Sequence, residues 1–351
     1  METLMPFRVL HVVESLGGGV LTSVLAMVDA TPGLEHHLAV WPRRSHADTG
    51  DDLAAFASVS TLSHHAVRAV VDLRELVGRL RPAEVHAHSS YAGLLARVVR
   101  PSTGVVYSPH CFAFERADLG STTRRLVRRV ERSLVGRTSV LVACSPFEAT
   151  LAAELGHREV VTVPNRALDL PDVRARFATP LRVVTAGRVG RQKDWRYLLT
   201  VKGYLEEVLG GRVEWEWLGG GDEAGEDALR EHGIHVTGWL PRGDVVRRLA
   251  DAQVYVHTAA WEAAPISILE ASAVGLPIAA RGITTLVSLE VPGTVATAAD
   301  LAARIVGLGD PNTWAAEQHR SLVFSSVHSA DLQRDRLYAA YGHVPAELAL
   351  R

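Results

Sequence analysis

The chain has 351 residues, of which 47% are hydrophobic, and this is enough apolar material for two packed domains. Its 37 Lys and Arg residues against 39 Asp and Glu residues give a formal net charge of −2, which excludes a global electrostatic field for nucleic acid. With only Cys111 and Cys144, the sequence excludes a disulfide framework and a four-cysteine zinc site.

The apolar run at residues 7–13 is too short for a secretory signal, and no apolar run reaches the ~18 residues of a membrane span. We therefore expect a cytoplasmic protein in a reducing compartment.

The first half of the chain repeats a β-branched run, a turn and a helical stretch. The predicted strands are "RVLHVV", "HHLAVW", "EVHAHSS", "GVVYSPH", "SVLVACS" and "EVVTVPN". Such alternation predicts a parallel, doubly wound sheet with helices between its strands.

A second series of the same kind begins after residues 166–180, which hold two prolines and no sustained apolar period and are predicted to be a linker. Its predicted strands are "LRVVTAGRV", "VEWEWLGGG", "HVTGWL", "AQVYVHT" and "LPIAAR". We expect an α/β protein with two Rossmann-like domains facing across a cleft. The predicted boundaries are 1–165, 166–180, 181–325, and a final helix in 326–351 that crosses back to the first domain.

Gly17, Gly18 and Gly19 follow the first predicted strand and open a helix. Glycine allows a ligand to approach the backbone closely, and the start of a helix offers N–H groups to an anion. A tight turn explains the same residues, and the three-glycine dinucleotide fingerprint is absent.

Arg188 and Lys193 follow a strand in "AGRVGRQKD". Two cations at the carboxyl end of a strand suit a diphosphate, since guanidinium binds two oxygens at once and ammonium is a mobile point charge. Simple solvation on the surface is the alternative.

Glu262 and Glu270 lie eight positions apart in "WEAAPISILEASAVGLPIAAR". If Pro265 begins a helix, loop 263–266 presents the N–H groups of Ala264 and Ile266 to a phosphate. The carboxylates then accept hydrogen bonds from hydroxyls, of a sugar for Glu262 and of a ribose for Glu270. The alternative makes them a helix-dipole acid and a buried ion-pair partner.

Histidines occur at two further strand ends. His110 follows "VVYSP", where its ring would donate to a sugar hydroxyl or a phosphate; a structural role is the alternative. His86 and His88 share one face of a strand, but no third metal ligand is evident, and we expect no metal.

Residues 122–137 form a predicted basic amphipathic helix. Its arginines fall within an arc of ~140°, while Leu126, Val127, Val130 and Leu134 gather on the other side, as expected for a helix packed on a sheet. The arginine face is either solvated or docks on anionic lipid headgroups, which would place the protein peripherally on the inner face of the cell membrane.

Together these motifs resemble the family 4 glycosyltransferases. The resemblance rests on the glycine loop, "VHAHSSYAG", "YSPHCFAFER", "TVPN", "AGRVGRQKD", "LGGGD", "VTGWLP" and the paired glutamates, in that order. It implies the GT-B fold and a retaining, metal-independent transferase without a cofactor, acting on a nucleotide diphosphate sugar such as a UDP- or GDP-sugar.

The resemblance also implies a role for each matching residue. Arg188 and Lys193 would hold the diphosphate, Glu262 the sugar and Glu270 the ribose. Gly17–Gly19 would close over the phosphate or reach the acceptor, His110 would contact the transferred sugar, and the backbone at Leu240 would read the base.

The acceptor would be a glycan, a glycolipid or a small natural product, and we expect no nucleic acid partner. Ala263-Ala264-Pro265 departs from the family's glycine-rich loop, so the sugar is not readable from the sequence. A sugar-nucleotide epimerase and a non-catalytic binding module are the alternative functions.

Overall fold

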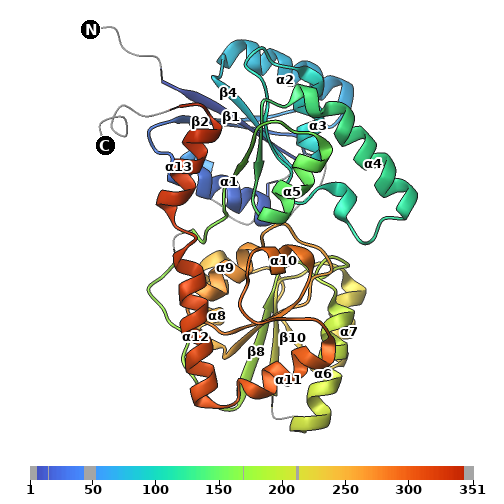
Figure 1. Ribbon diagram of the computed structural model, residues 1–351, viewed down its shortest axis with the longest axis vertical. Coiled ribbons are helices and arrows are strands. Elements are labelled where there is room, and N and C mark those ends of the chain that lie inside the picture. Colours follow the sequence, from blue (N-terminus) through green and yellow to red (C-terminus); the bar gives the residue numbers. More distant parts are fainter. Residues whose placement is uncertain (1–5, 15, 43–52, 169, 211–212, 344–351) are drawn as a thin grey trace. The chain divides into compact units, whose positions relative to one another are not determined.

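The computed structural model describes residues 6–14, 16–42, 53–168, 170–210 and 213–343 (Figure 1). It divides the chain into two compact units. Unit 1 comprises Met1–Asn165 and Ala330–Arg351, and unit 2 comprises Arg166–Ser329.

Unit 1 contains a parallel sheet with the strand order β3-β2-β1-β4-β5-β6-β7 among the described residues. Its strands are β1 (Arg8–Val13), β2 (Glu35–Val40), β3 (Ser58–Thr61), β4 (Glu84–His88), β5 (Val106–Ser108), β6 (Val140–Ala143) and β7 (Val160–Thr162). Its α-helices are α1 (Gly18–Ala30), α2 (Ala66–Leu80), α3 (Ser90–Val99), α4 (Ser121–Leu134), α5 (Pro146–Leu155) and α13 (Ala330–Ala340). Short 3₁₀ turns are η1 (Leu53–Ala55), η2 (Ala113–Glu115) and η3 (Val135–Arg137).

Alternate residues of these strands point to opposite faces of the sheet, and each face has its own apolar core. Leu10 and Val12 of β1 join a cluster that includes Leu73 of α2 and Leu95 of α3. Val9 lies in a different cluster, with residues of α1 and α13. Helices therefore cover both faces of the sheet, as in a doubly wound fold.

Unit 2 contains a second parallel sheet, with the order β10-β9-β8-β11-β12-β13 within the described chain. Its strands are β8 (Leu181–Ala186), β9 (Val213–Leu218), β10 (His235–Val236), β11 (Val254–His257), β12 (Ile278–Arg281) and β13 (Thr294–Val295). Its helices are α6 (Trp195–Leu209), α7 (Glu223–Glu231), α8 (Arg242–Asp251), α9 (Ile266–Ala273), α10 (Thr284–Ser288), α11 (Ala298–Gly307) and α12 (Pro311–Ser326).

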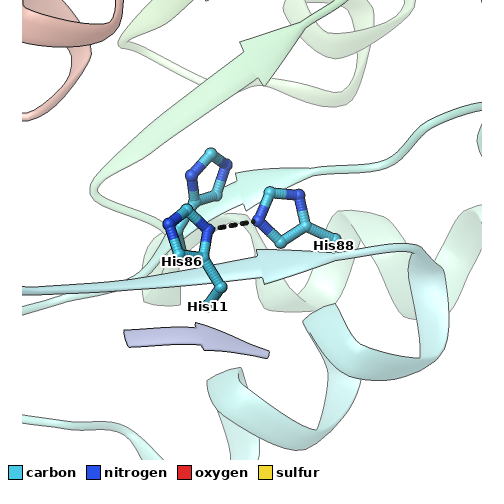
Figure 2. Close-up of side chains that lie close together, drawn as sticks. All are labelled: His11, His86 and His88. Atoms are coloured by element: carbon cyan, nitrogen blue, oxygen red, sulfur yellow. Dashed lines mark hydrogen bonds between the residues drawn. The ribbon is translucent and has the colours of Figure 1, made fainter. Parts of the chain in front are cut away.

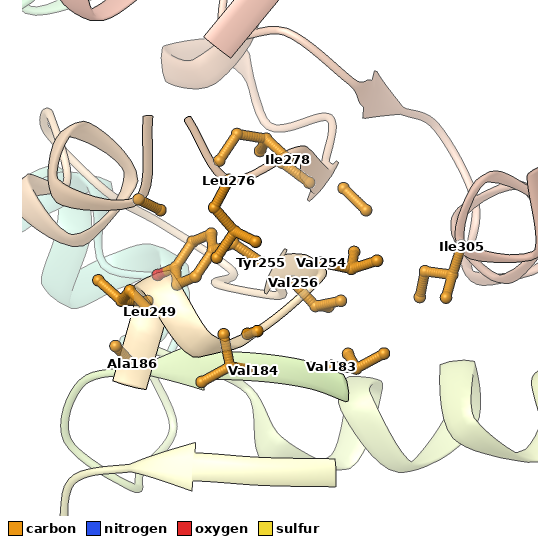
Figure 3. Packing of buried hydrophobic residues seen from close by; sticks show 14 of the residues in the cluster. Val183, Val184, Ala186, Leu249, Val254, Tyr255, Val256, Leu276, Ile278 and Ile305 are labelled. Carbon is orange, nitrogen blue, oxygen red and sulfur yellow. The ribbon is translucent and has the colours of Figure 1, made fainter. Parts of the chain in front are cut away.

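The core of unit 2 centres on β8 and β11 (Figure 3). Val183, Val184, Val254 and Val256 are at most 1% exposed, which is expected for strands that helices cover on both faces. These two parallel sheets confirm the predicted α/β class with two Rossmann-like units.

The chain passes from one unit to the other at residues 165–166 and 329–330. Residues 166–180 belong to unit 2, where the backbone N–H of Ala175 donates to the carbonyl of Val274 at 2.8 Å. Helix α13 belongs to unit 1, where it lies beside α1 (Figure 1). Residues 344–351 of the predicted segment 326–351 lie outside the described residues.

Candidate functional site

The loops after β8 and β11 meet at the carboxyl edge of the unit 2 sheet. The strand order reverses between these two strands, and ligands of open α/β sheets bind at such a switch point. Ala260 N donates to Gln192 O at 2.9 Å, and Thr258 Oγ1 donates to Lys193 O at 2.7 Å. The two loops therefore hold each other in place.

Lys193 and Glu262, both predicted site residues, form an ion pair between these loops. Lys193 Nζ lies 2.7 Å from Glu262 Oε1, and the side chains are 16% and 10% exposed. Gln192 Nε2 donates to the other carboxylate oxygen, Oε2, at 3.3 Å. The structure therefore brings a cation and an anion together where the sequence reasoning assigned each a separate ligand group.

His257, the last residue of β11, is buried next to this ion pair. Its Nε2 is 3.7 Å from Glu262 Oε1, and burial lowers the pKa of His257 well below its usual range, with a further lowering from the charge of Lys193. The ring is therefore neutral at pH 7. The sequence reasoning missed His257, although its place at the end of a predicted strand was a usable signal.

Glycines pack the loops after β8 and β9 closely together. A Cβ on Gly187 would lie 2.6 Å from Lys193 Cε, and one on Gly219 would lie 2.4 Å from the carbonyl oxygen of Gly187. Both glycines also have a positive φ, of 134° and 135°. Only glycine fits at these two positions, which explains part of the "LGGGD" motif.

Arg188 is exposed beside the same loops. Its guanidinium carbon lies 5.8 Å from the centre of the Trp239 ring, and its Cγ lies 2.8 Å from where a Cβ on Gly221 would be. A guanidinium carries several donors in one plane, so the exposed Arg188 side chain can bind an anion while its face lies near the Trp239 ring.

Glu270 is buried in α9 and forms an ion pair with Arg242, the first residue of α8. Arg242 Nε donates to Glu270 Oε1 at 2.8 Å, while Arg242 Nη2 is buried with no hydrogen-bond partner in the described part of the chain. Burial raises the pKa of Glu270, and the charge of Arg242 opposes that rise. The sequence reasoning missed Arg242, which follows the predicted base-reading residue Leu240 by two positions.

Helix α9 begins where the sequence predicted. Pro265 occupies its N-cap position, Ala264 is partly exposed, and Ile266 is a buried residue of the first turn. The first N–H groups of a helix have no partner within it, so this end can bind an anion. Thr285 Oγ1 donates to the carbonyl of Glu262 at 2.9 Å and fixes the loop that leads into it.

The predicted residues of unit 1 lie at the carboxyl edge of its own sheet. Gly17 is the N-cap of α1, and Gly18 has a φ of 70°. A Cβ on Gly18 or Gly19 would meet no atom within 4 Å, so only the backbone angle of Gly18 requires glycine.

His110 follows β5 and is partly exposed. Its Nε2 lies 3.0 Å from Nδ1 of His88, a fully buried residue at the end of β4. Burial lowers the pKa of His110 to about 4, so the ring is neutral at pH 7.

Three buried histidines of unit 1 correct one step of the sequence reasoning. His11 of β1 lies beside His86 and His88 of β4 (Figure 2), and one nitrogen of each ring lies within 4.8 Å of the others. A third nitrogen ligand therefore does exist, on the neighbouring strand. However, every ring nitrogen of the three already has a hydrogen-bond partner, so the rings need no ion to satisfy them.

Helix α4 corresponds to the predicted basic helix. Of its predicted apolar side, Val127 and Leu134 pack inward as expected, but Leu126 and Val130 do not. Leu126 is 60% exposed and Val130 is 42% exposed, whereas Glu131 is 3% exposed. The acid is buried because Arg97 of α3 binds it, with Nη2 at 2.9 Å from Oε2. The outer face of α4 therefore combines Arg125 and Arg129 with these two apolar side chains.

Comparisons with known proteins agree with this fold. Residues 18–166 match the model of a glycosyl transferase 4-like domain, and residues 180–311 match that of glycosyl transferases group 1. A Klebsiella pneumoniae protein described as an uncharacterized 41.2 kDa protein in the cps region is 22% identical over 80% of this chain and 82% of its own.

Two further similar proteins have named ligands or activities. The Escherichia coli UDP-Gal:alpha-D-GlcNAc-diphosphoundecaprenol alpha-1,3-galactosyltransferase is 24% identical over 60% of each chain. The crystal structure of Anabaena HepE in complex with UDP and glucose is 15% identical, covers 96% of this chain and 99% of its own, and gives a TM-score of 0.77.

The two Rossmann-like units and the matched domains define a GT-B glycosyltransferase, so the protein is a transferase. The chain belongs to the glycosyltransferases that join a family 4-like domain to a group 1 domain. Within the described residues, no helix is both long enough and apolar enough to span a membrane.

Proposed function

We propose that the protein is a retaining glycosyltransferase that moves a sugar from a nucleoside diphosphate donor to an acceptor hydroxyl. The observation that carries the proposal is the Lys193–Glu262 pair at the switch point of unit 2. An ammonium has three N–H donors, so Lys193 can retain its hydrogen bond to Glu262 while it donates another to a phosphate oxygen. Glu262 has a second oxygen that can accept a sugar hydroxyl.

Retention follows from attack on the face that the leaving group departs from. The bond between the anomeric carbon and the diphosphate oxygen breaks, the acceptor oxygen bonds on the same face, and the acceptor proton passes to the departing oxygen. Lys193, Arg188 and the N-terminus of α9 stabilise the charge that grows on the diphosphate. The reaction as proposed uses no metal ion.

Replacing Lys193 tests this assignment. We expect Lys193→Met to lower the turnover of donor hydrolysis or transfer by ~10²-fold, as the loss of one preorganised donor commonly does. Arg182→Met is the matched control, because Arg182 also forms an ion pair, with Glu214 at 2.9 Å, but lies at the start of β8. Equal turnover in the two variants would refute the role of Lys193.

The donor base is tested by ligand stabilisation. We propose a UDP-sugar, supported by the ligand of the Anabaena structure and the donor in the Escherichia coli relative's name. A ligand at about 100 times its Kd adds ~2.7 kcal/mol to the unfolding free energy. UDP should therefore raise the Tm more than GDP at equal concentration, and the reverse order would assign a GDP-sugar.

We further propose that the acceptor is a lipid-linked saccharide reached through α4 at an anionic membrane surface. The diphosphoundecaprenol acceptor in the relative's name supports this, as does the outer face of α4. An exposed helix face that joins arginines to apolar side chains suits the interface of an anionic bilayer.

Liposome co-sedimentation in low salt tests the membrane proposal. Arg125→Glu with Arg129→Glu should abolish binding to anionic vesicles, and Leu126→Ser with Val130→Ser should weaken it. Arg74→Glu with Arg79→Glu, on exposed positions of α2, makes the same charge change as a control. Equal binding to neutral and anionic vesicles, or equal loss in the control, would contradict a docking role for α4.

A further inference from the structure

A chain of buried imidazoles runs across the unit 1 sheet and ends at His110. His36 Nδ1 lies 3.0 Å from His11 Nε2, and His11 Nδ1 lies 2.9 Å from His88 Nε2. His88 Nδ1 lies 3.0 Å from His110 Nε2. Four rings from β2, β1, β4 and the loop after β5 are thus joined by three hydrogen bonds.

The alternation of the strands explains why these rings meet. Val85 and Ala87 of β4 belong to the core on the side of α2 and α3, so His86 and His88 point to the other face. The same alternation in β1, with Leu10 and Val12 in that core, puts His11 on the face of the two histidines.

At the end of this row of imidazoles farthest from His110, the groups around His36 Nε2 only accept hydrogen bonds. His36 Nε2 lies 3.2 Å from the carbonyl oxygen of Thr31 and 3.0 Å from its Oγ1. The Thr31 hydroxyl donates its own hydrogen bond to the carbonyl oxygen of Met27 at 2.7 Å. Both oxygens therefore accept from His36, and His36 Nε2 carries a proton.

One proton position then fixes all the others, provided that the rings are neutral. A neutral imidazole has one N–H and one bare nitrogen, so His36 Nδ1 is bare and accepts from His11 Nε2–H. The same reasoning gives Nε2–H to His88 and then to His110. Burial lowers the pKa of each of the four rings, which keeps them neutral.

We propose that His36, His11 and His88 are positioning residues that lock His110 in its Nε2–H form, so that His110 Nδ1 is a hydrogen-bond acceptor for a ligand hydroxyl. In the described part of the chain, no group bonds to His110 Nδ1, and the ring is partly exposed. A phosphate oxygen has no proton to offer this nitrogen, so the geometry selects a hydroxyl over a phosphate. The tautomer follows from the unit 1 geometry alone, whereas the assignment of the hydroxyl to a substrate rests on the proposed function.

The tautomers can be read directly. In ¹⁵N-histidine-labelled protein, two-bond ¹H–¹⁵N correlation spectra distinguish a bare ring nitrogen from an N–H, with signals assigned through single His→Gln variants. We expect Nε2–H and bare Nδ1 at all four histidines. Nδ1–H at any of them would overturn the proposal, and so would a stoichiometric metal ion bound to His11, His86 and His88.

Two replacements of His88 separate its hydrogen bond from its packing. His88→Asn places an amide oxygen near the position of Nδ1 and retains an acceptor for His110, whereas His88→Leu removes it. We expect His88→Leu to lower kcat/KM by about 3- to 10-fold more than His88→Asn, the range for one hydrogen bond. Equal kcat/KM and equal His110 spectra in the two variants would refute the positioning role.

Substrate analogues, of the donor or of the acceptor, that each lack one hydroxyl identify the ligand group. With the wild type, the analogue that lacks the contacting hydroxyl should have a kcat/KM about 3- to 10-fold lower than the full substrate, and His110→Leu should remove this difference. If the difference persists in His110→Leu for every analogue, the hydroxyl contact is wrong. If the wild type neither binds nor hydrolyses any nucleotide sugar, the proposed function fails, while the spectra still decide the tautomer.

Discussion

Glu84 begins β4 and holds its carboxylate oxygen Oε2 in the interior without a hydrogen-bond partner among the described residues. Burial raises the pKa of Glu84 to about 7. An acid whose pKa is raised by folding is protonated in both states well below pH 4.5 and ionised in both well above pH 7. Its charge therefore costs stability at high pH and not at low pH.

We expect Glu84→Gln to raise the free energy of unfolding at pH 8, by up to about 3 kcal/mol, and by much less at pH 5. Urea unfolding at the two pH values measures the difference. Glu75→Gln, on an exposed position of α2, is the control and should change little at either pH. A gain that is equal at pH 5 and pH 8 would show that ionisation is not its cause.

In unit 2, the sequence predicted some of the site residues but not the contacts between them. Lys193 and Glu262 were predicted because each follows a strand, and the strand ends do lie together. That the two form an ion pair was not predictable, since 69 positions separate them and the contact depends on β8 and β11 being neighbours. Arg242 was missed for the same reason, as it meets Glu270 only through the packing of α8 against α9.

Helix α4 shows the same limit for a whole element. A helical wheel separates arginines from apolar residues but does not identify the face that packs inward. Arg97 is fully buried and binds Glu131, and Tyr107 donates to the same carboxylate at 3.1 Å. These contacts bury the acid and turn Leu126 and Val130 outward, which the sequence reasoning had wrong.

We expect Glu131→Ala to lower the free energy of unfolding by about 3–5 kcal/mol, because it leaves Arg97 buried without its partner. Glu154→Ala is the matched control. It removes an acid that binds Arg128 of the same helix at 2.6 Å, but those side chains are 51% and 44% exposed. Exposed pairs contribute ~0–1 kcal/mol, so similar losses in the two denaturation curves would contradict this account of α4.

Across the whole molecule, buried histidines outnumber buried acids among the groups whose pKa is shifted. Among the described residues, eight histidines have a lowered pKa: His11, His36, His86, His88, His110, His157, His257 and His328. Four glutamates have a raised pKa: Glu84, Glu115, Glu148 and Glu270.

The two groups act oppositely on stability as the pH falls. Below about pH 6.5 these histidines are protonated in the unfolded state but remain neutral in the native state, so each lowers the free energy of unfolding as the pH falls. The four glutamates are protonated at a higher pH in the native state than in the unfolded state, so each raises the free energy of unfolding as the pH falls. Because the histidines are more numerous, we expect the free energy of unfolding to fall between pH 7 and pH 5, as followed by urea denaturation. Constant or rising stability would refute this balance.

The two βα series, the α/β class and the positions of the candidate ligand groups follow from the sequence alone. Strand and helix periodicity is a local property, and the carboxyl ends of parallel strands share an edge in any sheet of this kind. The strands β3 and β13 were missed because Val59 and Val295 are their only apolar residues, so neither strand has an apolar run or a clear alternation.

Which of these groups pair with one another depends on how the strands and helices pack in three dimensions. Lys193 meets Glu262, Glu270 meets Arg242, and His11 completes a hydrogen-bonded chain that ends at His110. Each contact joins residues on different strands or helices, so it depends on the strand order, which hydrogen bonds between distant segments set.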